Sequence, residues 1–256
     1  MTTDAHRRQA VGAQLPGSSP GWLRARDRQP EIMDQPDLDA ALHAHALNGL
    51  ERINFLSRTA AALWRPIRRL ALERPRSEPL RVLDIGCGGG DVAMALAHEA
   101  ARSGIPLWVE GCDISQRAID YARESSLRRG MTNVAFRRRD VLRESLPSGF
   151  DVVLCSLFLH HLDEDGAGRM LREMAMAARR LVLVSDLRRT RVGYVLASLV
   201  CRVLTRSPVV KVDGPLSVAA AFTLEEVLEL TRRNGMAEAT LQRIWPQRFL
   251  LTWKRP

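Results

Sequence analysis

Long apolar runs are missing from this chain of 256 residues. No stretch of about 18 uncharged apolar residues occurs, so the sequence predicts no membrane-spanning helix. The charged residues at the N-terminus are not followed by an apolar segment, which argues against a secretory signal peptide. We therefore expect a cytoplasmic protein.

Cysteine is scarce as well. The chain has four cysteines, and none of them stands in a Cys-x-x-Cys pair. The sequence therefore predicts neither a zinc site nor a disulfide framework. Such cysteine usage fits a reducing compartment.

The chain has few aromatic residues and few lysines. Its net charge of +9 rests almost entirely on arginine, because only Lys211 and Lys254 are lysines. A basic chain suggests a nucleic-acid partner. Aromatic residues, on which unpaired bases stack, make up only 5% of the chain. We expect no nucleic-acid partner.

The composition changes along the chain. Residues 1–30 are rich in Arg, Gln, Gly, Ser and Pro without an apolar period, which predicts a disordered extension. Residues 31–78 carry apolar residues at helical spacing, which predicts a helical cover whose first helix is capped by Asp37. Residues 79–256 are expected to form one α/β domain.

Apolar runs alternate with helical patterns from residue 80 onward. Strands are expected at 80–85, 107–112, 134–136, 151–157 and 181–185. Strands that are buried on both faces and separated by helices predict a doubly wound, mostly parallel sheet. Two last strands, 239–244 and 248–253, are joined at Pro246 and Gln247 and predict an antiparallel hairpin.

A glycine-rich loop joins the first of these strands to a helix. It has the sequence Asp84-Ile-Gly86-Cys-Gly88-Gly-Gly90-Asp91. Glycines let the backbone take positive φ and approach a ligand, and the helix N-terminus offers unpaired N–H groups. The dinucleotide pattern G-x-G-x-x-G fails at Asp91, and the P-loop Gly-Lys is missing. An acid two residues before the first glycine suits a cofactor with a cationic amino group; the alternative is a purely structural turn.

Two further acids follow the next two strands. Asp113 can accept hydrogen bonds from the two hydroxyls of a ribose, or it can cap the following helix. Asp140 can accept the amino group of adenine while Val141 donates its backbone N–H; the alternative is a turn acid that faces neighbouring arginines. Acids at three successive strand ends, after a glycine loop, predict a nucleoside cofactor.

These motifs resemble those of the class I, Rossmann-like methyltransferases over residues 79–256. The resemblance implies S-adenosylmethionine as the cofactor and a seven-stranded, mostly parallel sheet with an antiparallel terminal hairpin. It also implies that the glycine motif holds the methionine moiety, and that the acids hold ribose and adenine. The cofactor-binding residues it implies are Asp84, Gly86, Cys87, Gly88, Gly90, Asp113, Ile114, Asp140, Val141 and Cys155.

A turn with two adjacent histidines follows the fourth strand, as Leu159-His160-His161-Leu162. It resembles the corresponding turn of small-molecule methyltransferases that act on quinones, polyketides and sugars. Histidine titrates near neutral pH and can take a proton from an acceptor hydroxyl. We expect one of the pair, His161 ahead of His160, to be catalytic, while the other shapes the cofactor pocket.

Three acids, Asp163, Glu164 and Asp165, come directly after that turn. They are candidates for a divalent metal, but the pattern favours a helix cap, and we predict no metal site. The Pro-Pro-Tyr/Phe signature of amino-methylating DNA and glutamine enzymes is missing at residues 155–158. Nitrogen targets of that kind are therefore disfavoured.

The insertion at residues 190–221 is rich in apolar residues that suit an apolar or phenolic acceptor; the alternative is ordinary packing of a lid helix. The sequence predicts methyl transfer to a small organic molecule, with oxygen favoured over nitrogen or carbon. The alternatives are an RNA or protein methyltransferase and a non-catalytic binding protein. The sequence predicts nothing about the oligomeric state.

Overall fold

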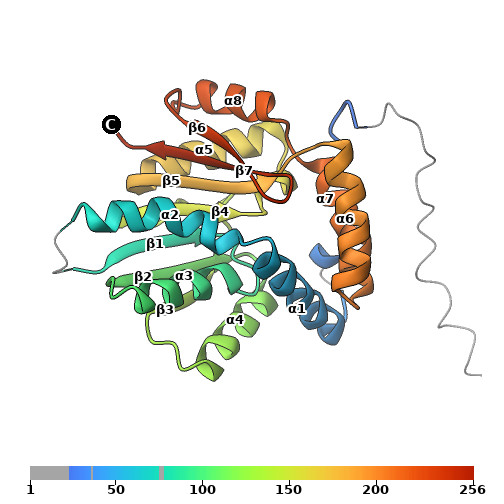
Figure 1. The fold of residues 1–256 in the computed structure, drawn as a ribbon, viewed down its shortest axis with the longest axis horizontal. Coiled ribbons are helices and arrows are strands. Elements are labelled where there is room, and N and C mark those ends of the chain that lie inside the picture. The colour runs from blue at the N-terminus through green and yellow to red at the C-terminus, as the bar shows by residue number, and fades with distance from the viewer. Residues whose placement is uncertain (1–22, 36, 75–77) are drawn as a thin grey trace, which may run out of the picture.

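A twisted seven-stranded sheet forms the centre of the computed structural model, which describes residues 23–35, 37–74 and 78–256 (Figure 1). The strands are β1 (Leu80–Ile85), β2 (Leu107–Asp113), β3 (Val134–Arg138), β4 (Phe150–Ser156), β5 (Ala178–Leu187), β6 (Thr240–Ile244) and β7 (Arg248–Lys254). Their order in the sheet is β3-β2-β1-β4-β5-β7-β6. The first five run parallel, and β7 is antiparallel to both of its neighbours. The predicted sheet and terminal hairpin are confirmed.

Helices cover both faces of the sheet and its carboxyl edge (Figure 1). They are α1 (Ala40–Leu56), α2 (Thr59–Leu72), α3 (Asp91–Arg102), α4 (Gln116–Arg128), α5 (Glu164–Ala177), α6 (Arg191–Leu204), α7 (Pro208–Ala220) and α8 (Leu224–Arg233), with short 3-10 helices η1 (Ile32–Asp34) and η2 (Leu159–His161). None of the helices in these described ranges is long and apolar enough to span a bilayer.

The strand residues point alternately to the two faces, as the period of two requires. In β1, Val82 packs in the core under α2, α3 and α4. Leu83 and Ile85 pack in the core under α5 and α8. Because a core lies on each face, the central strands β1, β4 and β5 are mostly apolar on both faces, whereas the edge strands β3 and β6 are partly polar and exposed.

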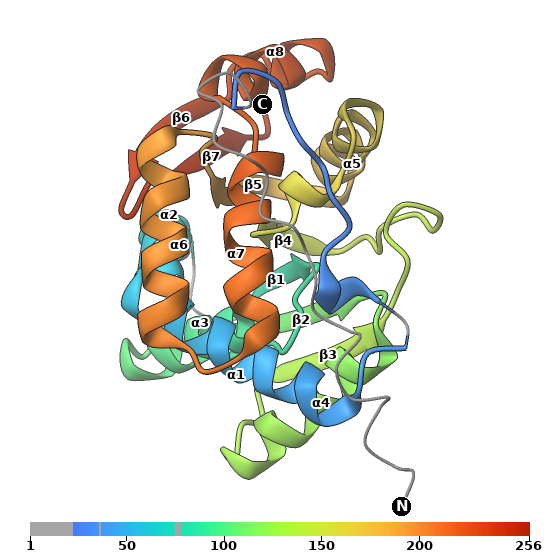
Figure 2. The ribbon, with the colours of Figure 1, turned by 90° about the vertical axis from the view of Figure 1, so that its right-hand side faces the viewer.

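Strands β1 and β4 are neighbours in the sheet. From β1 the chain continues to β2 on one side, and from β4 it continues to β5 on the other side. In an open α/β sheet such a switch point leaves a crevice at the carboxyl edge, where ligands bind. Helices α6 and α7, joined by a short loop, stand side by side in front of this edge (Figure 2). Helix α1 lies across their lower end and contacts α7.

The structure corrects the predicted N-terminal boundaries. Residues 23–30, assigned to a disordered extension, lie along the protein: Asp27 N–H donates to the carbonyl of Ala219 at 3.1 Å. Half-buried Arg26 donates to the carbonyl of Leu162 at 2.8 Å and stacks on Phe222. The sequence did not predict these contacts, because they are hydrogen bonds to backbone carbonyls that are distant in the chain and leave no local pattern. Residues 1–22 lie outside the described residues.

Two details of the predicted helical cover are also different. The cap of α1 is Asp39, whose side chain accepts the N–H groups of Ala41 and Leu42, and not Asp37. Helix α2 lies on the sheet instead of covering the site, since Leu63 and Ile67 are fully buried beside β1 and α3. Of the predicted helical cover, α1 and the segment with η1 before it cover the carboxyl edge, together with α6 and α7.

Candidate active site

A cavity of about 780 Å³ opens at the carboxyl edge of β1, β2 and β4. The glycine loop forms its floor, and α1, α6, α7 and the segment around η1 form its walls. This is the edge at which open α/β sheets bind ligands. A volume on this order is large enough for a nucleoside cofactor together with a small acceptor.

The glycine loop has the backbone geometry that the sequence required. Gly86 and Gly88 have φ values of +64° and +50°. A Cβ on Gly86 would lie 2.6 Å from Cγ of Phe158, so only glycine fits there. Cys87, between them, donates its N–H to the carbonyl of Cys112 at 3.0 Å, which ties the loop to β2. All three loop residues line the cavity.

Asp113 connects the glycine loop to the next βα turn. One carboxylate oxygen accepts the N–H of Gly88 at 2.9 Å, and the other accepts the N–H of Ser115 at 2.8 Å. Burial raises the pKa of Asp113, while these two hydrogen bonds oppose the increase. Ser115, and not Asp113, is the cap of α4. Asp113 lines the cavity beside the exposed side chain of Ile114.

The third predicted acid lies at the rim of the cavity. Asp140 accepts the N–H of Leu142 at 3.1 Å and pairs with Arg143 at 3.6 Å. Val141 is buried next to it and also lines the cavity. Both residues therefore line the cavity, and their contact with adenine stays a prediction.

Three of the predicted cofactor residues do not line the cavity: Asp84, Gly90 and Cys155. Gly90 is the N-cap of α3, and a Cβ there would collide with the ring of Phe136. Cys155 is fully buried within β4. Asp84 is buried beneath the loop, and neither carboxylate oxygen has a hydrogen-bond partner among the described residues. Burial, with the charges of Asp91 and Asp113, raises the pKa of Asp84 well above its usual range.

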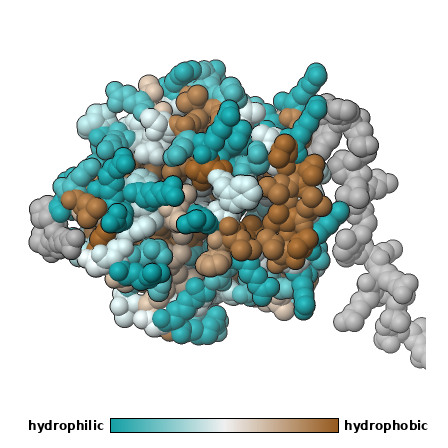
Figure 3. Space-filling model, viewed as in Figure 1, coloured by the Kyte–Doolittle hydropathy of each residue, from teal (hydrophilic) through white to brown (hydrophobic). Residues whose placement is uncertain are grey.

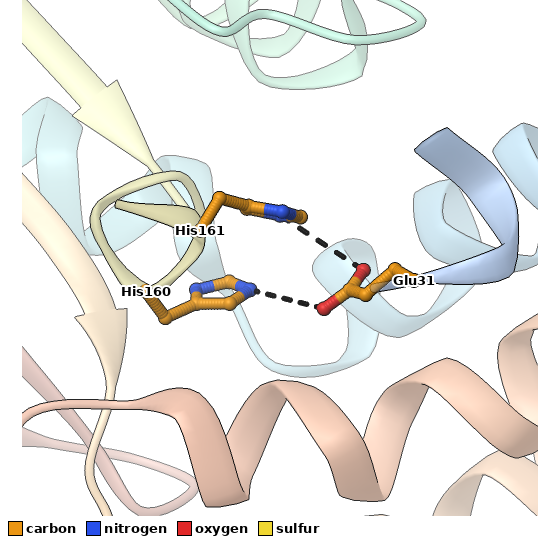
Figure 4. Close-up of side chains that lie close together, drawn as sticks. All are labelled: Glu31, His160 and His161. Atoms are coloured by element: carbon orange, nitrogen blue, oxygen red, sulfur yellow. Dashed lines mark ion pairs between the residues drawn. The ribbon is translucent and has the colours of Figure 1, made fainter. Parts of the chain in front are cut away.

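The two histidines on η2 have different environments. Buried His160 places Nδ1 2.7 Å from a carboxylate oxygen of Asp186 in β5. Half-exposed His161 places Nδ1 3.1 Å from a carboxylate oxygen of Asp34 in η1. Both Nε2 atoms point toward the carboxylate of Glu31, at 3.7 Å and 3.9 Å (Figure 4). The predicted histidine pair thus lies within a set of carboxylates.

These carboxylates and histidines shift each other's proton affinity. Burial lowers the pKa of His161, but its hydrogen bond to Asp34 and the charges of Glu31 and Asp34 outweigh burial and raise the pKa to about 9. Burial opposes ionisation of Asp186, but the charge and hydrogen bond of His160 outweigh it and lower the pKa of Asp186. Asp186 is therefore held as a carboxylate.

Residues 23–35, which we call the N-terminal strap, connect the histidine turn η2 with α7. Asp213 on α7 accepts the N–H groups of Ile32 and Met33 at 2.9 and 3.0 Å. Arg28 donates to the carbonyl of His161 at 3.0 Å, and Arg26 donates to the carbonyl of His160 at 3.2 Å. The strap therefore forms hydrogen bonds to the backbone of η2 through its arginines, and to α7 through its own backbone N–H groups.

A buried cation, Arg248, lines the far side of the cavity from β7. It donates to the side chains of Asn54 and Thr59. Its Nε has no hydrogen-bond partner among the residues that the structure describes. Burial lowers the pKa of Arg248 to about 10, which leaves it cationic at neutral pH.

Several of these residues were not predicted from the sequence: Glu31, Asp34, Asp186, Asp213 and Arg248. Asp186 lies at the carboxyl end of β5, directly after the expected strand 181–185, so an acid at a strand end was a usable signal. Glu31 and Asp34 gave no signal, because they approach the histidines only through the fold of the strap.

The apolar insertion has two different faces. Leu196 and Val200 of α6, with Val210 and Val218 of α7, line the cavity. The residues Val192, Val195, Leu199 and Val203 of α6 point outward and form an exposed apolar patch (Figure 3). The sequence left two roles open for the insertion, helix packing and an apolar wall for the acceptor. In the structure the insertion forms two packed helices, and one of its faces lines the cavity with apolar side chains.

The acids after η2 form a helix cap, as the sequence favoured. Asp163 is the N-cap of α5 and accepts the N–H of Gly166 at 2.7 Å. Glu164 pairs with Arg26 at 3.0 Å on the surface. Neither residue lines the cavity.

Known proteins resemble the chain in sequence over part of its length. Residues 82–180 match the family model of a methyltransferase domain. A ubiquinone biosynthesis O-methyltransferase of Leptothrix cholodnii is 26% identical over 155 residues, which cover 60% of this chain and 57% of that protein. One of Bordetella parapertussis is 29% identical over 179 residues, which cover 68% and 61%. The chain thus matches less than two thirds of the length of these relatives.

Solved structures resemble it in fold. The methyltransferase SibL, in its apo form, has a TM-score of 0.60 at 20% identity, with coverage of 91% of this chain and 65% of that one. The magnesium protoporphyrin IX methyltransferase of Synechocystis PCC 6803, solved with S-adenosylhomocysteine, has a TM-score of 0.53 at 20% identity, with coverage of 78% and 83%. At these identities the likeness shows the fold alone.

Proposed function

We propose that this chain, which belongs to the class I S-adenosylmethionine-dependent methyltransferases, transfers a methyl group to an oxygen of a small organic acceptor. The observation that carries the proposal is a single cavity with a glycine loop and Asp113 at one end and the histidine pair at the other. The RNA or protein methyltransferase considered from the sequence finds no support among the relatives described above.

The residues of the glycine loop fit S-adenosylmethionine. Gly86 and Gly88 take positive φ values and line the cavity, so the backbone of the loop can approach the methionine moiety closely. We assign Asp113 to the ribose hydroxyls and Asp140 with Val141 to the adenine, because all three residues line the same cavity as the glycine loop. When bound, this cofactor supplies a methyl group on a sulfonium, which is electrophilic.

Arg248 and Asp84 extend this fit. Arg248 lines the cavity, where its guanidinium can bind the carboxylate of the methionine moiety. Asp84 is buried beneath the loop, and its carboxylate oxygens have no hydrogen-bond partner among the described residues, so a cationic amino group bound above the loop would favour its ionised form. We assign Arg248 to the cofactor end of the cavity and Asp84 to the layer beneath it.

The histidine pair lies at the acceptor end. In the reaction the acceptor oxygen forms a bond to the methyl carbon while the carbon–sulfur bond breaks, and the proton of the acceptor hydroxyl leaves. The sequence favoured His161 for this proton. The geometry supports His160 more, because Asp186 can accept its Nδ1–H and leave the Nε2 lone pair facing the cavity.

We further propose an apolar or aromatic acceptor and a cytoplasmic location. The acceptor end is bounded by Leu196, Val200, Val210 and Val218, a wall that favours an apolar ring or chain. All four cysteines are free and buried, which is typical of proteins from a reducing compartment.

The proposed function is tested by titrating the purified chain with S-adenosylmethionine and S-adenosylhomocysteine in a calorimeter. We expect micromolar binding in the wild type and at least tenfold weaker binding in Asp113→Ala, because each hydrogen bond to a charged group contributes roughly 1.5–3 kcal/mol. Asp120→Ala, which removes an exposed carboxylate from α4, is the matched control and should bind normally. Absence of binding in the folded wild-type protein would refute the proposal.

A further inference from the structure

The side chains of Glu31, His160 and His161 converge on one point at the acceptor end of the cavity (Figure 4). One ligand atom from each lies within 4.8 Å of the other two. The Nε2 atoms lie 3.7 and 3.9 Å from the Glu31 carboxylate, which is too far for a hydrogen bond. Two ligands about 2.1 Å from one tetrahedral ion lie about 3.4 Å apart. The spacing is thus close to that of ligands around an ion.

Each of the three side chains is oriented by a second group. Asp186 holds Nδ1 of His160 at 2.7 Å, and Asp34 holds Nδ1 of His161 at 3.1 Å. Ser217 on α7 donates its hydroxyl to Glu31 at 2.6 Å. Metal-binding histidines almost always have their other ring nitrogen bonded to a carboxylate or carbonyl in this way, and metal-binding carboxylates are hydrogen-bonded as well.

We propose that Glu31, His160 and His161 bind a divalent transition-metal ion of the Zn²⁺, Co²⁺ or Fe²⁺ type. Two imidazoles and one carboxylate suit such ions, whereas Mg²⁺ and Ca²⁺ prefer oxygen ligands alone. Asp34 and Asp186 add negative charge around the same point. Three protein ligands leave coordination positions open, as in catalytic sites, and these positions face the cavity because all three ligands line it.

The consequence for catalysis rests on the proposed function. A hydroxyl that binds an open position of the ion becomes more acidic, so its proton can leave to solvent without a protein base. The Nε2 lone pair of His160 then serves as a ligand instead of accepting that proton. An acceptor with two neighbouring oxygens, such as a catechol, fits two open positions best.

The test uses the full chain without a histidine tag, stripped of metal by a chelator and dialysed. It is titrated with Zn²⁺ in a calorimeter and with Co²⁺ by visible absorption. We expect one ion per chain, with binding at least tenfold weaker in Glu31→Gln and in His161→Gln. His98→Gln removes an exposed histidine from α3 and is the matched control, which should bind as the wild type does. Circular dichroism verifies that each variant is folded.

Absence of saturable binding in the wild type, or equal binding by the ligand variants, would overturn the metal site. Asp34→Asn keeps all three ligands and loosens one of them, and we expect it to weaken binding roughly tenfold. S-adenosylmethionine binding is measured in the metal-free protein in parallel. Intact cofactor binding without metal binding refutes the metal site alone, and metal binding without cofactor binding refutes the proposed function alone.

Discussion

The imidazole of His160 and the carboxylate of Asp186 form a 2.7 Å hydrogen bond between the turn that follows β4 and the carboxyl end of β5. A second hydrogen bond joins the backbone N–H of His160 to the other carboxylate oxygen at 3.2 Å. Asp186 therefore fixes both the ring and the backbone of the residue that faces the acceptor end. Whether the Nε2 atom binds a proton or a metal ion, its position depends on this carboxylate.

The first prediction concerns Asp186→Asn. The amide keeps the shape of the side chain but loses the charge that orients the imidazole, so we expect the methyl-transfer rate to fall roughly 10–100-fold. The affinity for S-adenosylmethionine, measured in a calorimeter, should change less than twofold, because the side chain of Asp186 does not line the cavity. Asp163→Asn alters a helix cap of α5 outside the cavity and should leave the rate unchanged. An Asp186→Asn variant with the wild-type rate would contradict the assigned role.

The second prediction concerns the glycine loop. Gly86→Ala places a methyl group 2.6 Å from the ring of Phe158 at a residue with a φ of +64°. We expect it to lower the free energy of unfolding by about 2 kcal/mol or more and to weaken cofactor binding at least tenfold. Gly104→Ala has a φ of +61° but open space around the new methyl group, so it isolates the backbone cost of about 1–2 kcal/mol. Urea denaturation of both variants measures the difference, and equal losses would show that the contact with Phe158 is unimportant.

The third prediction concerns Arg248→Met, which keeps the bulk of the side chain and removes its charge. If the guanidinium binds the carboxylate of the cofactor, the Kd for S-adenosylmethionine rises at least tenfold. Asn54 and Thr59 lose their donor, so the free energy of unfolding also falls, by roughly 1–3 kcal/mol. Arg243→Met, on the exposed side of the same hairpin, is the control. A folded Arg248→Met protein with the wild-type Kd would remove Arg248 from the cofactor site.

The fourth prediction is a pH dependence. Burial, with the charges of Glu31 and Asp34, raises the pKa of Asp213 to about 6, although the N–H groups of Ile32 and Met33 oppose the increase. Because the folded-state pKa lies above that of the unfolded chain, about 3.9, the folded state binds the proton first. The contribution of Asp213 to stability is therefore largest below about pH 4 and is lost as the pH rises through 6.

Asp213→Asn removes this dependence and isolates it from other titrating groups. We expect the free energy of unfolding of the wild type, relative to the variant, to increase by about 1–3 kcal/mol between pH 7.5 and pH 4.5. Urea denaturation at pH 7.5, 6.0 and 4.5 measures the difference. A constant difference between the two proteins over this range would show that Asp213 titrates normally.

The residues that could be predicted from the sequence are those whose role is local in the chain. Gly86 and Gly88 must be glycines because of the loop that contains them, and Asp113 follows its strand directly. Parallel strands bring their carboxyl ends to one edge, so a periodic pattern was enough to place Asp113, Asp140 and His160 together. Their assignment to cofactor and acceptor remains a prediction for the experiments above.

The residues that the sequence could not predict are held by contacts between distant segments. Glu31 meets His160 across 129 positions of the chain, and Arg26 meets Leu162 across 136. No period or local motif encodes such a contact, since its energy comes from burial and hydrogen bonding that exist only after the strap lies on α7.

The sequence by itself therefore determined the sheet, the glycine loop and the edge at which ligands bind, because local propensity and burial patterns act over a few residues. Only the tertiary structure decided which side chains surround the two histidines. It brought Glu31 and Asp34 from the N-terminal strap and Asp186 from β5 to one point. The chemistry at that point depends on charges a few ångströms apart, and such distances are set by packing, not by position in the chain.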